Sequence, residues 1–532
     1  MYKVSSILFG VASFALVGGT SYAGVTPVNL TIHTRTGTFI GDLNDTYPDV
    51  RQFKYVPYAK PPVGPLRWAP PERLDNSSET YESTVFGPAC PQYVSSVPSA
   101  WALNITGNMI VNYGESLLAG DVAWNSAEDC LTLAVWTPAD ATPDSKLPVI
   151  VYLTGGGDVT GGINIPTQLP ANWVHNSQKH IVVTTNYRVN IFAYPHARGL
   201  NGSDNFGLQD QRMAVEWVAE NIAAFGGDAS RITLWGQSAG AIAADMYLFA
   251  YYEDPIIHAA IASSGTALAS DVLGETDFDS AGTNFTFVAK SLGCDFSDPK
   301  FELECMRHVP MQRIENFVGQ YQDNSTLVNT SQPAIKFTHQ ETVDNTYVFS
   351  NYTERFFDGK IAKVPEIIGT TAREGSPLAP YNPAGPSEQT VVSITLGFVC
   401  PAHNTSLYRN DIGLLTYRYE WAGNFSNIAP VPWLGAYHYS DLYMLFGTYV
   451  IAPGVVTDLE VQTSLQMQQY FYDFISDPKS LPANGWPAYN VWQTGGGSLA
   501  RFGADGRTVQ IIDGDLVEGA CHLPGAVYNT TP

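Results

Sequence analysis

Basic side chains are scarce in this chain. Among its 532 residues, 27 Lys and Arg stand against 50 Asp and Glu, which gives a formal net charge of -23 and a pI near 4.7. Nucleic acids and anionic membrane surfaces would repel such a chain. The charge balance therefore argues against either as a partner, and a role in solubility explains it more simply.

Long apolar segments, repeats and linkers are also missing. Beyond Ala23 no run approaches the roughly 18 apolar residues of a transmembrane helix, and the polar tail 528–532 lacks the hydrophobic end of a GPI-anchor signal. No internal repeat or low-complexity linker divides the chain. With 45% apolar and only 14% charged residues the composition is globular. We expect one domain over residues 24–532 and no stable membrane anchor.

The first residues have the pattern of a secretory signal. Lys3 is followed by an apolar stretch from Val4 to about Val17 and then by small residues that end at Ala23. The apolar stretch is too short to span a bilayer. We expect cleavage after Ala23, which makes residues 1–23 a signal peptide and the mature protein secreted and extracellular.

Cysteines and glycosylation sequons fit an extracellular product. Six cysteines in an exported chain suggest three disulfides, and six cysteines allow fifteen pairings. Sequence proximity alone favours three pairs, which are Cys90–Cys130, Cys294–Cys305 and, by elimination, Cys400–Cys521. Twelve Asn-x-Ser/Thr sequons occur, among them Asn76, Asn104, Asn201, Asn324, Asn351, Asn404 and Asn424. We therefore expect a disulfide-bonded glycoprotein.

Strand-like and helix-like segments alternate in the middle of the chain. Residues 148–153, 181–185 and 231–235 read as buried strands. Apolar residues recur at helical spacing over 208–222, and an alanine-rich helix is expected over 241–246. This alternation predicts the α/β class, with a mostly parallel central sheet flanked by helices.

A serine stands between the last of these strands and the helix that follows it. The segment Gly236-Gln237-Ser238-Ala239-Gly240 matches the G-x-S-x-G nucleophile elbow, in which a sharp turn exposes the serine and the glycines avoid a collision between helix and strand. The string alone is weak evidence in a chain with 47 glycines. Its position after a strand and before a helix makes Ser238 a candidate nucleophile.

A serine nucleophile needs a base, and in this fold the acid and then the histidine follow the serine along the chain. Downstream of a plausible acid only three histidines remain. His403 adjoins a glycosylation sequon and His522 adjoins Cys521, which predicts surface positions for both. Elimination leaves His438 as the general base.

The sequence also contains candidates for the acid and for the oxyanion hole of such a site. Glu374 ends the strand-like segment 367–375, where an acid could orient the histidine, but spacing alone does not distinguish it from other acids. The glycine run after strand 148–153 offers the backbone N–H groups of Gly156 and Gly157 as an oxyanion hole, together with that of Ala239. The glycine run could instead form a phosphate-binding loop, but the Gly-Lys-Ser/Thr sequence of such a loop does not follow it.

Taken together, these strings resemble the type-B carboxylesterase family, which includes cholinesterases, fungal lipases and the non-catalytic neuroligins. The likeness covers nearly the whole mature chain. The other motifs that carry it are 56–64, 86–90, 128–131, 186–188, 207–211, 225–228 and the histidine loop 435–441. The resemblance implies an α/β-hydrolase fold, the triad Ser238, Glu374 and His438, the oxyanion hole Gly156, Gly157 and Ala239, a second serine near the acid at Ser264, and the disulfides Cys90–Cys130 and Cys294–Cys305.

The chain departs from the family pattern at several positions. Thr154 stands where esterases often carry histidine, and Asp158 replaces the usual phenylalanine, which brings a carboxylate near a site of developing negative charge. Gln237 stands where cholinesterases carry glutamate, so we do not expect a cholinesterase. The interval from Glu374 to His438 is short for the family, which suggests that a helical portion over the active-site gorge is missing.

These observations favour a secreted carboxylic ester hydrolase that needs no metal or organic cofactor and acts on a small-molecule or lipid ester. One alternative is a lipase or sterol esterase in which the loop between Cys90 and Cys130 acts as an interfacial lid. Another is a neuroligin-like adhesion or binding protein without catalysis, and acyl transfer to an alcohol other than water would use the same residues.

Overall fold

The computed structural model describes residues 28–105, 121–123, 125–269, 282–325, 341–493 and 495–528. The predicted signal peptide lies outside these residues, as does much of the predicted lid loop. The central sheet has eleven strands in the order β16-β15-β14-β13-β12-β11-β9-β10-β8-β4-β3. Its strands are β3 (Asp42–Leu43), β4 (Val50–Pro57), β8 (Thr132–Pro138), β9 (Leu147–Leu153), β10 (Ile181–Thr185), β11 (Gly227–Gln237), β12 (Ala259–Ser263), β13 (Glu366–Thr371), β14 (Thr416–Trp421), β15 (Ser498–Phe502) and β16 (Val509–Asp513).

The strand pairing makes the sheet mostly parallel, as predicted. Neighbouring strands from β10 through β9 and β11 to β15 run parallel. The outer pairs, namely β10 with β8, β8 with β4, β4 with β3 and β15 with β16, are antiparallel. Two smaller sheets are formed by β1 (Thr31–Thr34), β2 (Gly37–Ile40) and β5 (Thr80–Glu82), and by β6 (Tyr93–Val94) and β7 (Asp121–Val122).

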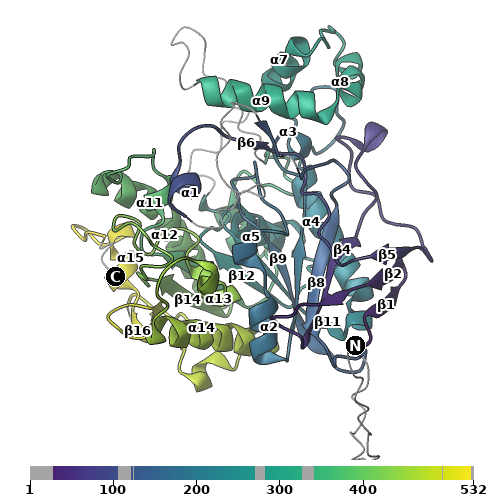
Figure 1. Ribbon diagram of the computed structural model, residues 1–532. Helices are drawn as coiled ribbons and strands as arrows, with labels where there is room; N and C mark the ends of the chain where they lie inside the picture. Colours follow the sequence, from purple (N-terminus) through teal and green to yellow (C-terminus); the bar gives the residue numbers. More distant parts are fainter. Residues whose placement is uncertain are drawn as a thin grey trace, which may run out of the picture.

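Helices cover both faces of the sheet (Figure 1). The described α-helices are α1 (Ala100–Leu103), α2 (Ala171–Ser177), α3 (Asn190–Ala193), α4 (Phe206–Asn221), α5 (Ala239–Ala250), α7 (Thr283–Ser291), α8 (Pro299–His308), α9 (Met311–Ser325), α10 (Tyr352–Phe357), α11 (Gly375–Leu378), α12 (Glu388–Asp411), α13 (Asp441–Phe446), α14 (Asp458–Ser476) and α15 (Asp515–Glu518). None of them is long and apolar enough to cross a membrane.

Strand β9 shows why the sheet is buried on both faces. Its residues alternate between two cores: Val149, Val151 and Leu153 pack in the core that includes α4 and α5, whereas Ile150 and Tyr152 pack in the core that includes α2, α13 and α14. A parallel strand that is covered on both faces consists almost entirely of apolar residues. The apolar run 148–153 therefore predicted this strand. The segments predicted for β10, β11 and α5 fall within the observed elements, and the helical segment predicted over 208–222 extends one residue beyond α4, into the 3-10 helix Ile222–Phe225.

Helices α7, α8 and α9 gather above one end of the sheet (Figure 1) and pack on a small separate core that also includes Trp68 and residues of α3 and α4. The Cys294–Cys305 disulfide lies within this group, which we call the cap. The other disulfides join Cys90 to Cys130 and Cys400 to Cys521, so all three expected pairs are present.

One prediction about the surface is wrong. His403 is buried, with its Nδ1 3.0 Å from Glu518 Oε2, and its ring stacks on that of His522 at 4.5 Å between centroids. Glu518 also accepts from Arg418. His403 therefore belongs to a buried ionic cluster, although the neighbouring Asn404 is exposed as a sequon requires.

The cap contains a carboxyl group that should make stability depend on pH. Glu315 on α9 is fully buried, and burial raises its pKa from an ordinary value near 4.5 to about 8, with a smaller opposing effect of the Asn190 side chain. Because the pKa of Glu315 is higher in the folded than in the unfolded state, the carboxyl contributes to the free energy of unfolding. This contribution is fully present below pH 4.5 and is lost as the pH rises to about 8.

We therefore expect Glu315→Gln to flatten the fall in unfolding free energy between pH 4.5 and 8, by roughly 4 kcal/mol at most. Urea denaturation of both proteins across this range measures the effect. Glu304→Gln on the neighbouring helix α8, where the side chain is exposed, serves as the control. Parallel pH curves for the wild type and Glu315→Gln would contradict the prediction.

Candidate active site

The loop between β11 and α5 holds Ser238 in an unusual backbone conformation. Its φ is 56° and its ψ is -128°, a region that residues other than glycine rarely occupy. A Cβ at Gly236 would overlap the Gly240 carbonyl, and one at Gly240 would overlap the Leu153 carbonyl. Ser238 is partly exposed, whereas Gln237 and Ala239 are buried. The strained turn thus presents the serine as a nucleophile elbow does.

An acid and a base meet at the same edge of the sheet. His438 Nδ1 lies 2.5 Å from Glu374 Oε2, and both residues are fully buried. The second oxygen of Glu374 accepts from the backbone N–H of Thr371 at 2.7 Å, at the carboxyl end of β13. The N–H of Arg373 donates to the carbonyl of Ala436, which joins the acid turn to the histidine loop. The pair is the arrangement in which a carboxylate orients an imidazole.

The outer nitrogen of the imidazole faces a glutamine. His438 Nε2 lies 3.1 Å from the side-chain nitrogen of Gln237. Within the described residues Ser238 Oγ has no hydrogen-bond partner, and Gln237 occupies the position at Nε2 that a serine would take in a completed triad. The structure therefore brings Glu374 and His438 together. Against Nε2 of His438 it places Gln237 rather than Ser238, the next residue in the chain.

Aromatic rings flank the imidazole. The ring of Phe398 on α12 lies 5.0 Å from that of His438, and the half-buried Trp101 on α1 lies 6.5 Å from it. Trp101 also makes edge contacts with Tyr437 and Tyr439. The surroundings of the base are thus aromatic on two sides.

The glycine run after β9 packs against the elbow. A Cβ at Gly155 would come within 2.8 Å of Ser238 Cβ, so only glycine allows this approach. The backbone N–H groups of Gly156, Gly157 and Ala239 donate no hydrogen bond to any residue in the described ranges. Free N–H groups beside a serine side chain are what an oxyanion hole requires.

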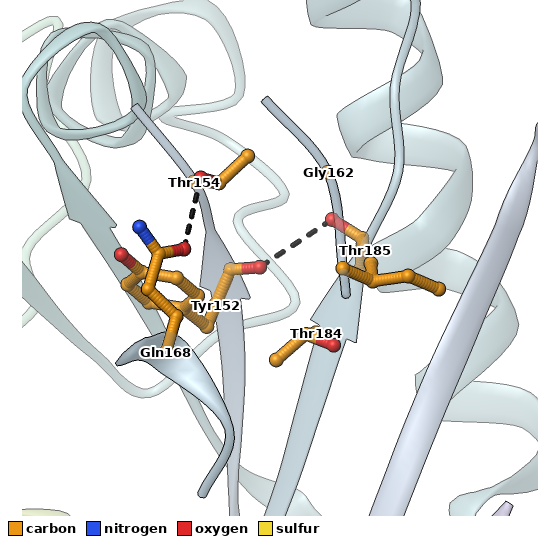
Figure 2. A pocket seen from close by; sticks show the side chains of 7 residues that line it. Tyr152, Thr154, Gly162, Gln168, Thr184 and Thr185 are labelled. Atoms are coloured by element: carbon orange, nitrogen blue, oxygen red, sulfur yellow. Dashed lines mark hydrogen bonds between the residues drawn. The ribbon is translucent and has the colours of Figure 1, made fainter. Parts of the chain in front are cut away.

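Side chains hold both ends of this glycine loop. At the start, the Thr154 hydroxyl donates to Gln168 Oε1 at 2.9 Å in a closed pocket behind the loop (Figure 2), and the Thr154 carbonyl accepts from the hydroxyl of Tyr187 at 2.5 Å. At the far end, the amide of Gln92 bonds to both the N–H and the carbonyl of Gly161. Thr154 thus supports the loop from behind through its hydroxyl.

Asp158 and Ser264 complete the predicted residues. Asp158 is buried; its carbonyl accepts from the N–H of Asn190 at 2.5 Å. Burial raises the pKa of Tyr187 and of Tyr194 well above the ordinary range, and the nearby charge of Asp158 raises both further. Ser264 is buried with a φ of 60°, and its hydroxyl makes no hydrogen bond to Glu374 or to any other described residue.

Sequence reasoning missed the glutamines of this site. Gln92 and Gln168 gave no signal, because a glutamine that bonds to a distant loop looks like any surface glutamine. Gln237 was noted only for the charge it lacks. Among the residues that the structure describes, no group of three or more His, Cys, Asp or Glu side chains could hold a metal ion.

A mostly parallel sheet with a strained serine after one strand, free amide N–H groups beside it and a buried histidine–glutamate pair defines a serine hydrolase of the α/β-hydrolase type. A family model described as the carboxylesterase family matches residues 28–394. The chain belongs to this family, and it is a serine ester hydrolase.

The chain is similar to named proteins over nearly its full length. It is 38% identical to "Secreted lipase 5" of Gibberella zeae, with 97% of this chain and 98% of the relative covered. It is 39% identical to "Chlorogenic acid esterase" of Aspergillus niger, with 92% and 94% covered. It is 26% identical to "Liver carboxylesterase 1" of Oryctolagus cuniculus, with 90% and 91% covered. The protein is secreted like the relatives whose names say so, as its first residues predict.

The support behind the glycine loop leads to a prediction. Thr154→Val removes the hydroxyl but keeps the shape of the side chain, and it leaves Gln168 Oε1 without its donor in a buried pocket. We expect kcat to fall about tenfold with little change in KM, because the loop amides would be less well aimed at the oxyanion.

Steady-state kinetics on a nitrophenyl ester measure this effect. Thr184→Val is the matched control, because Thr184 lines the same pocket (Figure 2) and its hydroxyl has no hydrogen-bond partner within the described chain. Equal kcat values for the two variants would show that Thr154 does not support the loop.

Proposed function

We propose that this protein hydrolyses carboxylic esters through an acyl-enzyme on Ser238. His438 takes the proton of Ser238 as the hydroxyl attacks the ester carbonyl, and it returns the proton to the leaving alcohol. Water then attacks the acyl-enzyme with His438 again as the base, and this step releases the acid and restores the serine. No cofactor takes part in this sequence.

The other predicted residues have supporting roles. Glu374 accepts from Nδ1 of His438, which fixes one tautomer and stabilises the imidazolium that forms during attack. The N–H groups of Gly156, Gly157 and Ala239 receive the oxygen that becomes negative in the tetrahedral intermediate. For attack, Nε2 of His438 must exchange its contact with Gln237 for one with Ser238 Oγ, and the two residues are adjacent in the chain.

The buried hydrogen bond between His438 and Glu374, 2.5 Å long and beside the strained serine, carries this proposal. A surface pair of these types would be solvated and common. A fully buried pair next to a serine at a φ of 56° is costly to maintain and is typical of catalytic sites.

Substitution of the triad tests the proposal. We expect Ser238→Ala to lower kcat by about 10⁴- to 10⁶-fold, and Glu374→Gln by about 10⁴-fold because the wrong histidine tautomer would be favoured. Labelling by a fluorophosphonate probe should be lost in Ser238→Ala and retained in Ser145→Ala, a change at an exposed serine. Full activity or labelling of Ser238→Ala would refute the assignment.

The aromatic surroundings of His438 favour esters that carry an aromatic group. Trp101 is half-buried and makes T-shaped contacts with three rings of the histidine loop, and such a group of rings favours an aromatic substrate. One relative is named for chlorogenic acid, an aromatic ester. We therefore propose hydroxycinnamate esters as the first substrate class.

Fatty acyl esters are the second candidate. Leu103 on α1 and Leu378 on α11 are exposed, and the two helices pack against each other (Figure 1). Trp101 lies on α1, and Glu374 directly precedes α11. Exposed apolar side chains near an active site suit a lipid substrate. Several relatives are named lipases.

A panel of aromatic and alkyl esters of similar size separates the two classes. We expect Trp101→Ala to raise KM for a hydroxycinnamate ester about 3- to 10-fold and to change KM less for a hexanoate ester, because ring stacking is lost only for the former. Trp492→Ala, at an exposed tryptophan, is the control. A larger effect on the alkyl esters, together with activity that rises sharply above the solubility limit of the substrate, would favour the lipase.

A further inference from the structure

The glycine loop after β9, residues 155–161, contains a strained turn. Gly156 and Gly161 have φ values of 131° and 128°, and Asp158, although it is not a glycine, has a φ of 58°. The turn is tightly folded, since a Cβ at Gly156 would come within 2.2 Å of the Thr160 carbonyl oxygen. Backbone strain of this kind persists only where the surrounding structure holds it in place. The loop therefore depends on contacts with neighbouring segments.

Asn190, the first residue of α3, binds the second half of this loop. Its backbone N–H donates to the Asp158 carbonyl at 2.5 Å. Its side-chain Nδ2 donates to the Pro91 carbonyl at 2.8 Å and to the Val159 carbonyl at 3.5 Å. Its Oδ1 accepts from the N–H of Phe192 at 3.2 Å. Because a carbonyl only accepts and a backbone N–H only donates, the amide fits in this orientation alone.

The backbone of Asn190 needs a residue that tolerates the left-handed region. Its φ is 49°, and the residue is 1% exposed. Asparagine adopts this region more easily than most residues with a side chain. Glycine would adopt it as well, but it would leave the buried Pro91 carbonyl without its donor. A change to glycine therefore removes the side-chain contacts and keeps the backbone conformation.

Gln92 holds the same half of the loop from a second side. Its Nε2 donates to the carbonyls of Cys90 and Gly161 at 3.0 and 2.9 Å. Its Oε1 accepts from the N–H of Gly161 at 3.1 Å and from the hydroxyl of Thr160. All four hydrogen-bonding positions of this buried amide are thus used. Cys90 is in turn disulfide-bonded to Cys130, so the segment that carries Gln92 is itself anchored next to β8.

We propose that Asn190 and Gln92 are positioning residues that fix the glycine loop in the conformation that aims its free N–H groups at the oxyanion. These groups are the N–H groups of Gly156 and Gly157. The inference rests on the function proposed above. Both side chains act through the loop, since their polar atoms bond to the protein itself. An oxyanion hole stabilises the transition state more than the bound ester, so a displaced loop should lower kcat with little effect on KM.

Substitution of Asn190 tests the inference, with nitrophenyl acetate as the substrate. In Asn190→Gly we expect kcat to fall about 5- to 20-fold and KM to change by less than about twofold, because only the aim of the loop is lost. The matched control is Asn345→Gly, which makes the same change at an exposed asparagine with a φ of 54°. Equal kcat values for the wild type and the two variants would contradict the inference.

Inhibition by a trifluoromethyl ketone gives a readout that a merely structural role would not change. Ser238 Oγ adds to the ketone carbon, the serine proton passes to His438, and the ketone oxygen becomes an alkoxide that the oxyanion hole must bind. In Asn190→Gly we expect the inhibition constant Ki to rise by about the same factor as kcat falls. A fall in kcat with an unchanged Ki would contradict the inference, because the variant would then act outside the oxyanion hole.

Gln92→Met tests the second residue. Methionine has a similar volume and removes all four hydrogen bonds of the amide. We expect the same pattern, with kcat lowered, Ki raised and KM nearly unchanged. Gln468→Met is the control, because Gln468 on α14 is also buried but bonds to Asn172 and to the Leu445 carbonyl.

The outcomes separate this inference from the function on which it rests. If Asn190→Gly or Gln92→Met melts cooperatively and keeps the wild-type kcat and Ki, the inference is wrong. If one of the two variants does not fold, the other decides the question. If Ser238→Ala is as active as the wild type, or if the ketone does not inhibit the wild type, the proposed function itself fails, whatever the kinetics of these variants.

Discussion

The close packing of β11, α5 and the glycine loop at Ser238 is the constraint on which the site depends. Ser238 can stand at a φ of 56° only because Gly236, Gly240 and Gly155 leave room where any side chain would collide with backbone or with Gln237. The strain is maintained by the apolar sheet around it, since residues 232–237 of β11 and nearly all of α5 are buried. Without this rigid surrounding the turn would relax and the serine would withdraw.

The polar groups near the serine form one connected frame. Thr154 and Gly161, at the two ends of the glycine loop, are held by Gln168 and Gln92. Gln92 follows Cys90 closely, so the Cys90–Cys130 disulfide also restrains the loop that would bind the oxyanion. A single hydrogen bond of this kind contributes about 1 kcal/mol to stability. Its larger effect is on the direction of the loop amides, because transition-state stabilisation depends on alignment.

Several buried carboxyl groups have raised pKa values, which makes the stability of the fold depend on pH. Burial raises the pKa of Glu315 and Glu366 to about 8 and that of Asp245 and Asp441 to about 6. The charge of Arg409 opposes the effect of burial on Glu366, which lies 3.1 Å from it, and on Asp245. A net charge of -23 repels itself less when part of it is neutralised.

Local patterns were sufficient for much of the fold. Apolar runs such as 148–153 and 181–185 predicted β9 and β10, because a strand buried on both faces must be apolar throughout. The three disulfides and the elbow at Ser238 also followed from short strings, aided by the family resemblance. The cap core, the burial of His403 and the contacts of Gln92 and Gln168 did not, since they join residues far apart in the chain.

The sequence by itself determined the fold class, the family and the candidates for the nucleophile, acid and base, because each depends on neighbouring residues or on their order along the chain. It also predicts an export signal. The tertiary structure alone decided which partner the base meets. Residue 238 was expected to face Nε2 of His438, and residue 237 faces it instead. The direction of a side chain at a strained turn depends on the packing of strands and loops that are distant in sequence. That packing cannot be predicted from a short sequence motif.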